Sequence, residues 1–325
     1  MKLVEPPDRS PSKPGPGPVP PAVLRTLDLA VMKKIDSLVP GEHLTPQTGQ
    51  GTELQMIRPY FPGDDVRHID WNATARLQEP YVRVHVGERA LTTWLVLDVS
   101  ASMAFGTAER RKADVAEGVA LAVGHVATRR GNRLGVLAFG DGEPRILRPR
   151  QGRTGLLALL AELRRESTGA ASSSLGAALS SAATLGRQRG LVIVVSDFRG
   201  ERDWEKPLTQ LRARHGVLAV EIVDPREQQL VPAGDLWLVD PETGRQIHVD
   251  TRRRKVRRAF EAAAANERAD VRAALRRTGA DHVELSTAGD WLRIFASHLR
   301  RSESALRSGA PSRATVANRL REGRA

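Results

Sequence analysis

From residue 91 onward the sequence alternates short apolar runs with longer segments in which apolar residues recur at helical spacing. This alternation is typical of βαβ units and predicts a largely parallel, buried sheet. The expected strands are Trp94–Asp98, Arg133–Phe139, Arg145–Arg148, Leu191–Asp197, Val217–Asp224 and His282–Leu285. The expected helices are Glu109–Arg130, Gly155–Arg165, Ser174–Arg187, Trp204–Arg214, Thr251–Thr278 and Gly289–Leu299. The pattern therefore predicts an α/β fold with a mostly parallel sheet flanked by helices.

The remaining segments lie around this predicted domain of residues 91–300. Residues 1–21 are rich in proline and are expected to form a disordered leader. Residues 22–90 form an N-terminal extension, with a helix expected at Val23–Val39 and extended segments at 53–58 and 80–89. Within the domain, residues 230–250 predict a β-hairpin insertion and residues 251–279 a basic helix. Residues 301–325 read as a basic, flexible tail.

Composition narrows the kinds of site that the chain can build. It contains no cysteine, which excludes disulfides, thiolate metal sites and cysteine nucleophiles. The start lacks the apolar core of a secretory signal, and no apolar run is long enough to cross a bilayer. We therefore expect a cytoplasmic protein without membrane insertion. Its net charge of +12 comes mainly from residues 251–325.

An Asp-x-Ser-x-Ser sequence follows the first strand of the predicted domain, with Asp98, Ser100 and Ser102 in one tight loop. This loop belongs to the carboxyl edge of the sheet, where open α/β folds bind ligands. Asp197 ends another strand at the same predicted edge, and Ser172, Ser173 and Ser174 precede a helix. Carboxylates and hydroxyls are hard oxygen ligands that suit Mg²⁺ or Mn²⁺. The alternative for Asp98 alone is a helix N-cap.

The segment Leu95-Val96-Leu97-Asp98-Val99-Ser100-Ala101-Ser102-Met103 resembles the first strand and metal-ion-dependent adhesion site of von Willebrand factor A domains. The upstream pattern Arg58-x-Tyr60-x-x-Gly63-Asp64-Asp65-x-Arg67-x-Ile69-Asp70-Trp71-x-x-x-Ala75-Arg76 is similar to the bacterial family catalogued as domain of unknown function 58 (DUF58). The similarity covers about residues 22–300. It implies a von Willebrand factor A-like (Rossmann-like) fold.

The resemblance also implies a ligand set and a kind of partner. In such domains the Asp and two Ser of the first loop, a hydroxyl of a second loop and an Asp of a third hold the metal. Here these positions correspond to Asp98, Ser100, Ser102, Ser173 and Asp197. The second loop departs from the more usual Gly-Thr-Asp-Leu, because this chain has Ser172-Ser173-Ser174-Leu175 and lacks the extra carboxylate.

In the family pattern an acidic side chain of a partner protein completes the metal shell. Family members are commonly encoded beside MoxR-type AAA+ ATPases. The resemblance thus implies a non-catalytic adaptor that works with such an ATPase during assembly or activation of another complex.

The segment from Gly63 to Trp71 combines several charges with apolar side chains. One interpretation is a second metal or phosphate site. The other is structural: a turn at Pro62-Gly63, a helix cap by Asp64, and ion pairs of Arg67, Asp70 and Arg76 that brace the extension against the main domain. We favour the structural interpretation.

Two other functions were weighed against the adaptor hypothesis. A metal-dependent hydrolase is the first, but phosphate-loop, Gly-x-Ser-x-Gly and His-Glu-x-x-His motifs are all missing from the sequence. The second is nucleic-acid binding through the basic C-terminal region, led by Arg252-Arg253-Arg254-Lys255. Aromatic residues are not interleaved with these arginines, and Val256, Phe260, Ala263, Val271 and Leu275 predict a buried stripe that leaves the charges on a solvated face.

Overall fold

The computed structural model describes residues 15–17, 20, 53–86, 92–106, 109–128, 132–163, 173–186, 188–239 and 245–307. The chain divides into two compact units, Val39–Leu91 and the combination of Met1–Leu38 with Thr92–Ala325. Each unit is considered by itself. The predicted helix Val23–Val39 and almost all of the predicted leader lie outside the described residues, as does the chain after Arg307.

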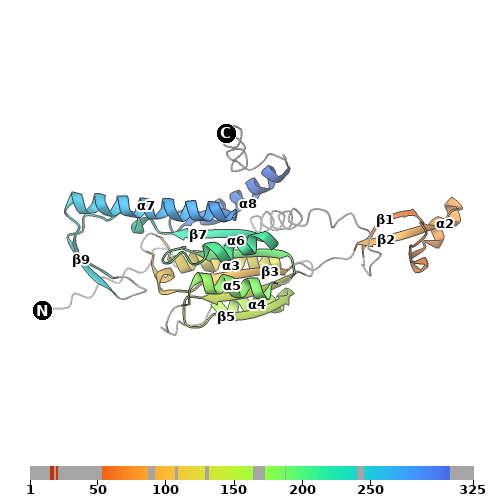
Figure 1. Cartoon of the computed structure of the whole chain (residues 1–325), viewed down its shortest axis with the longest axis horizontal. Helices are drawn as coiled ribbons and strands as arrows, with labels where there is room; N and C mark the ends of the chain where they lie inside the picture. Colours follow the sequence, from red (N-terminus) through yellow and green to blue (C-terminus); the bar gives the residue numbers. More distant parts are fainter. Residues whose placement is uncertain are drawn as a thin grey trace. The chain divides into compact units, whose positions relative to one another are not determined.

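A six-stranded sheet forms the centre of the larger unit (Figure 1). Its strands are β3 (Thr92–Asp98), β4 (Arg133–Phe139), β5 (Arg145–Gln151), β6 (Gly190–Ser196), β7 (Gly216–Val223) and β10 (Asp281–Ser286). Their order is β10-β7-β6-β3-β4-β5, and all neighbours are parallel except β5, which pairs antiparallel with β4. The predicted mostly parallel α/β architecture is confirmed.

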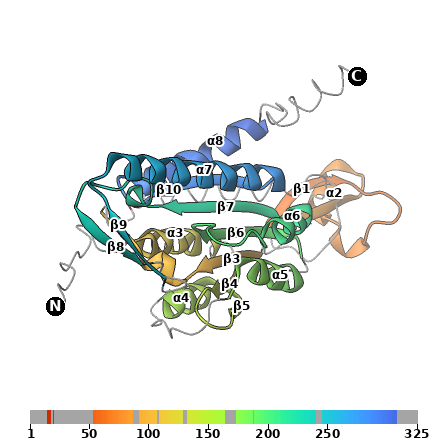
Figure 2. The same cartoon turned by 60° about the vertical axis from the view of Figure 1, so that its left-hand side comes forward.

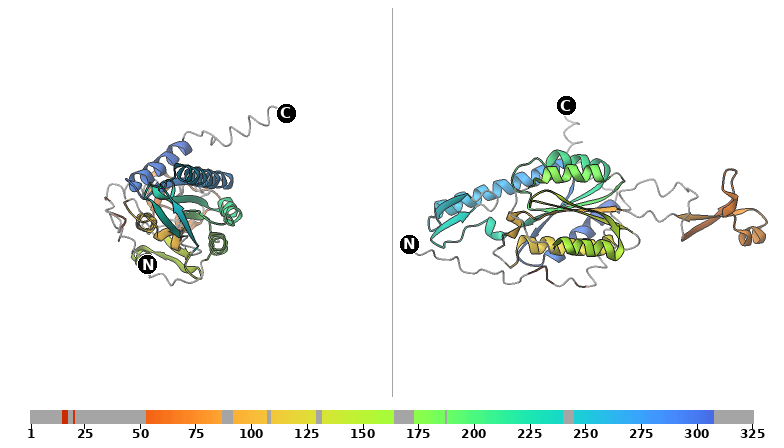
Figure 3. Two further views of the ribbon diagram at one scale, coloured as in Figure 1. Left: turned by 90° about the vertical axis from the view of Figure 1, so that its left-hand side faces the viewer. Right: turned by 90° about the horizontal axis from the view of Figure 1, so that it is seen from below.

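Helices cover both faces of this sheet (Figure 3). On one side lie α3 (Lys112–Ala127), α4 (Gly152–Leu163) and α8 (Trp291–Arg307). On the other lie α5 (Leu175–Leu185), α6 (Glu205–Arg214) and α7 (Arg254–Thr278). Side chains of a buried strand alternate between the two faces: Trp94 and Val96 pack with α5, α6 and α7, while Leu95 and Leu97 are buried on the opposite side. Burial on both faces explains why β3, β6 and β7 are continuous apolar runs.

Helix α7 differs from its prediction along its first half. Val271 and Leu275 are buried as expected, but Val256 and Phe260 are only half-buried and Ala263 is exposed. The reason is visible in Figure 1, where this half of the helix extends past the sheet, beside the hairpin of β8 (Asp235–Val239) and β9 (Gln246–Asp250). The predicted hairpin is present, because β8 and β9 pair antiparallel (Figure 2).

The last helix also differs from its prediction. We expected it to end at Leu299 and a flexible tail to begin at residue 301, whereas α8 continues to Arg307. No helix in the described part of the chain is long and apolar enough to span a bilayer.

The smaller unit contains the antiparallel strands β1 (Glu53–Pro59) and β2 (Tyr81–Val86) and the helix α2 (Trp71–Leu77). The charges of its Gly-Asp-Asp segment have partners inside the unit. Asp64 does not cap a helix as predicted; its carboxylate accepts two 2.7 Å hydrogen bonds from the Arg58 guanidinium, which hold its pKa down at about 2.

The helix caps of this unit come from neighbouring aspartates instead. Asp65 accepts from the Arg67 amide, and Asp70 accepts from the Asn72 and Ala73 amides while pairing with Arg83 at 2.9 Å. These contacts support the structural interpretation of the segment. They differ from the prediction in one respect: the partners shown for Asp64 and Asp70 belong to the smaller unit itself, whereas we expected ion pairs with the main domain.

Candidate metal centre

The two predicted carboxylates are brought to the same edge by strand pairing. Asp98 is the last residue of β3, and Asp197 follows the last residue of β6. These strands are parallel neighbours in the register Leu97↔Val195, so their carboxyl ends emerge side by side. Both aspartates are buried, with about 5% of their surface exposed. The convergence predicted from two separate strand ends is therefore present.

Asp98 is held by neutral groups. One carboxylate oxygen accepts from the Ser100 amide at 3.0 Å, and the other accepts from the Ser196 hydroxyl at 2.6 Å. Burial, followed by the negative charge of Asp197, raises the pKa of Asp98 to about 6. Two buried carboxylates this close disfavour one another's ionised form, and a cation would relieve that cost.

The first loop folds as a short 3₁₀ helix, Ala101–Ala104, with Ser100 at its N-cap. Its two serine hydroxyls lie 3.0 Å apart, and that of Ser102 also hydrogen-bonds Asp197. The hydroxyls of the first loop thus connect the Asp98 side of the site to the Asp197 side.

Gly140, which follows β4, fits closely against this loop. Its φ is +99°, a region that favours glycine, and a Cβ placed on it would lie 2.7 Å from the Cβ and the amide nitrogen of Ser100. The Gly140 amide donates a 2.9 Å hydrogen bond to the Ser173 hydroxyl. Gly140 therefore contacts both the first loop, at Ser100, and Ser173, the predicted second-loop residue. Of the other two candidates, Ser174 instead caps α5 through the Ala177 amide, and Ser172 lies outside the described residues.

Lys112 is the residue that sequence reasoning missed. It is the first residue of α3 and is completely buried, and its ammonium donates to Asp197 at 2.6 Å and to Glu227 at 2.8 Å. Burial acts to raise the pKa of Asp197, but the charge and hydrogen bond of Lys112 bring it below its ordinary value. The sequence contains one indication of this burial. Lys112 lies one turn before Val115, Val119 and Val126, on the same apolar stripe of the helix.

Ser196 is a second residue that the sequence did not single out. Its hydroxyl donates to Asp98 and accepts from the Phe198 amide at 3.0 Å. It therefore fixes the Asp98 carboxylate to the loop that carries Asp197.

These donors fit a hard divalent cation. The two carboxylates and the hydroxyls of Ser100 and Ser102 are linked by hydrogen bonds, and the hydrogen-bond partners of Asp98 in the described part of the chain are a backbone amide and hydroxyls rather than a basic side chain. The described ranges contain no cluster of three or more histidine, aspartate or glutamate residues arranged to hold a metal. The site at Asp98 is of a different kind. The fit rests on hydroxyls as much as on carboxylates.

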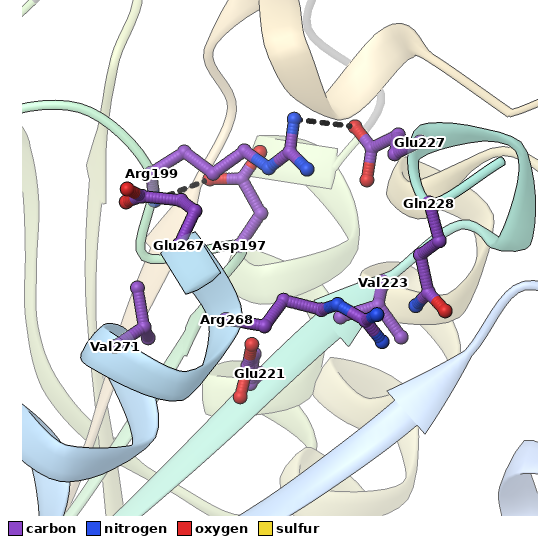
Figure 4. A pocket seen from close by; sticks show the side chains of 9 residues that line it. All are labelled: Asp197, Arg199, Glu221, Val223, Glu227, Gln228, Glu267, Arg268 and Val271. Atoms are coloured by element: carbon purple, nitrogen blue, oxygen red, sulfur yellow. Dashed lines mark hydrogen bonds and ion pairs between the residues drawn. The ribbon is translucent and has the colours of Figure 1, made fainter. Parts of the chain in front are cut away.

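A small pocket lies beside Asp197, between the ends of β6 and β7 and helix α7 (Figure 4). Its lining is mostly charged, unlike the apolar pockets that hold organic cofactors. Arg199 connects two sides of this pocket, because its amide donates to Asp197 at 3.1 Å and its guanidinium lies 3.5 Å from Glu227. The lining residues are Asp197, Arg199, Glu221, Val223, Glu227, Gln228, Glu267, Arg268 and Val271. The candidate centre thus borders a charged depression.

Basic residues stand before and at the start of α7, on a part of the fold that is open to solvent. Arg252, Arg253, Arg254 and Lys255 are all exposed. Their exposure suits a solvated face, and the nucleic-acid hypothesis stays a prediction.

Comparison with known proteins gives a family. The family model described as "Protein of unknown function DUF58" matches residues 56–270. Uncharacterized protein Rv1480 of Mycobacterium tuberculosis is 40% identical over 288 residues, which is 86% of this chain and 90% of that protein.

Two solved structures are similar to part of the chain at low identity. An aerotolerance-related membrane protein from Bacteroides fragilis is 14% identical with a TM-score of 0.43, and the match covers 66% of this chain and 99% of that one. The SpRpn10 VWA domain is 14% identical with a TM-score of 0.35, and the match covers 66% and 95%. Beside its six-stranded sheet, the described part of the chain has two two-stranded sheets, the β1–β2 and β8–β9 hairpins.

Proposed function

This chain belongs to the family described as protein of unknown function DUF58, and we propose that it is a non-catalytic protein-interaction module that binds Mg²⁺ or Mn²⁺ at Asp98, Ser100 and Ser102. One observation supports the proposal most strongly. Among the residues that the structure describes, the hydrogen-bond partners of the buried Asp98 carboxylate are a backbone amide and hydroxyl groups, all of them neutral. A buried charge without a counter-charge is costly, so this arrangement favours a cation.

Each residue of the site has a distinct part in this proposal. Asp98, Ser100 and Ser102 supply oxygen ligands from one loop, and Ser173 adds a hydroxyl from a second. Asp197 orients the Ser102 hydroxyl, and Ser196 orients Asp98. A hard cation bound there would supply a further coordination position for an acidic side chain of a partner protein.

The family resemblance suggests what that partner is. We propose that a MoxR-type AAA+ ATPase, or a client protein that such an ATPase remodels, offers the acidic side chain. The chain would then act as an adaptor that binds its partner only when the metal is present. Removal of the metal by EDTA would release the partner.

Binding of Mn²⁺ by the wild-type protein and by Asp98→Ala tests the metal site. Isothermal titration should give one site in the wild type and an affinity at least about 100-fold lower in Asp98→Ala, because a direct ligand contributes more than the outer groups whose loss costs about 10–100-fold. The variant should still fold, since it removes a buried carboxylate whose ionised form is disfavoured.

Asp270→Asn is the matched control for this titration. Asp270 is an exposed aspartate of α7, 3.8 Å from Arg202, and its replacement should leave Mn²⁺ affinity unchanged. Equal heats of Mn²⁺ binding in the wild type and in Asp98→Ala would contradict the proposed function.

A further inference from the structure

Lys112 is a cation buried inside a carboxylate cluster. Its side chain has no exposed surface, and its ammonium lies between Asp197 and Glu227, whose side chains are 4% and 11% exposed. Three elements meet there: the start of α3, the loop after β6, and the short 3₁₀ helix Pro225–Glu227 after β7. A lysine ammonium is expensive to bury, so this position requires both carboxylates as partners.

The charges of the cluster are divided unequally. Lys112 bonds Asp197 and Glu227, and Arg199 adds a second, partly exposed positive charge beside Glu227. In the described part of the chain, the hydrogen-bond partners of Asp98, on the neighbouring strand, are all neutral. Lys112 therefore compensates the charge on the Asp197 side of the site, whereas the described residues give Asp98 no such cation.

Asp197 is also fully engaged by the protein itself. One of its oxygens accepts from Lys112 at 2.6 Å and the other from the Arg199 amide at 3.1 Å, while the Ser102 hydroxyl provides a further bond. Asp98 is therefore the carboxylate with an uncompensated charge for a divalent cation. Asp197 contributes to the metal site indirectly, through its hydrogen bond with the Ser102 hydroxyl.

We infer that Lys112 is a built-in counter-ion of this centre, which holds Asp197 and Glu227 together without a metal and limits the affinity of the metal bound at Asp98. The inference rests on the proposed function and goes beyond it, because it assigns part of the centre's positive charge to the chain itself. Two measurable consequences follow. The wild-type fold is not dependent on metal, and removal of the lysine charge makes the centre bind metal more tightly.

The test compares wild type, Lys112→Met and Lys206→Met in thermal melts and Mn²⁺ titrations. Methionine has a similar length without the charge, and Lys206 is an exposed lysine of α6 that serves as the matched control. Lys112→Met should lower the Tm by about 10 °C, because it leaves the buried Asp197 carboxylate without its cation and the half-buried Glu227 with Arg199 alone. It should bind Mn²⁺ at least about tenfold more tightly than wild type, since like charges near the ion no longer repel it.

Saturating Mn²⁺ should restore most of the lost Tm in Lys112→Met, since a ligand that binds the folded state stabilises it. It should change the Tm of the wild type and Lys206→Met much less. The double variant Lys112→Met/Asp98→Asn should lose the rescue. If Lys112→Met folds too poorly to be measured, the double variant Lys112→Met/Glu227→Gln replaces it. This variant also removes the charge of a carboxylate that has lost its lysine partner, and it should show the same gain in Mn²⁺ affinity.

The outcomes separate this inference from the proposed function. Wild-type binding of Mn²⁺ with no tighter binding and no rescue in Lys112→Met would overturn the role of Lys112 and leave the metal site standing. Binding by Lys112→Met alone would support Lys112 as the built-in cation and overturn metal binding by the native protein. Binding by neither protein would overturn both.

Discussion

Replacement of Gly140 by alanine is expected to destabilise the protein by about 3 kcal/mol and to lower Mn²⁺ affinity at least about tenfold. The backbone at Gly140 has φ = +99°, which costs a residue with a Cβ about 1–3 kcal/mol. The new Cβ would also lie 2.7 Å from the backbone nitrogen and the Cβ of Ser100, so the loop must move. Chemical denaturation gives the first value and calorimetric titration the second.

Gly279→Ala separates these two effects. Gly279 also has a left-handed backbone, φ = +70°, at the end of α7, but a Cβ there would meet no atom within 4 Å. This control should lose only about 1 kcal/mol through backbone strain and bind Mn²⁺ normally. Gly140→Ala with wild-type affinity would contradict the close fit of Gly140 against the first loop.

Trp204→Ala is expected to cost about 3–5 kcal/mol in the free energy of unfolding, the range for large aromatic side chains in cores. Trp204 is fully buried and packs edge-on against Phe198, with ring centroids 5.3 Å apart. Phe198 directly follows Asp197 and has φ = 53°, an unfavourable value for a non-glycine residue. Loss of the indole therefore also releases the loop that positions Asp197, and denaturant titration measures the cost.

Trp204→Phe is the conservative counterpart. The indole nitrogen is buried with no hydrogen-bond partner within the described part of the chain, so phenylalanine removes an unsatisfied donor and keeps most of the apolar volume. We expect a loss below about 1.5 kcal/mol. A loss as large as that of the alanine variant would show that the packing against Phe198 is not the source of the stability.

Much of the fold was predictable because its physical signals are local. β3 and β6 are apolar on both faces, so each appears in the sequence as an uninterrupted run that requires helices above and below. The hairpin of β8 and β9 has the turn-forming sequence Pro241-Glu242-Thr243-Gly244 between its two strands, so it too was predictable. The position of Asp98 at a strand end followed directly from the end of its apolar run.

The rest depended on contacts between distant segments. The sequence does not state that β3 pairs with β6, yet that pairing brings Asp98 and Asp197 together. It marks Lys112 only as a charge on an apolar stripe, and the partners that make the burial tolerable lie 85 and 115 residues further along the chain. The exposed first half of α7 was missed because an apolar stripe indicates what a helix could bury but not how far the sheet beneath it extends.

Crystals grown with Mn²⁺ and measured at the manganese absorption edge test the central claim most directly. The account predicts one anomalous peak within about 2.5 Å of an Asp98 carboxylate oxygen and of the Ser100 and Ser102 hydroxyls, with Asp197 still bonded to Lys112. The same crystals of Asp98→Ala should show no peak there. A fully loaded wild-type crystal with manganese elsewhere, or with none at Asp98, would contradict the account.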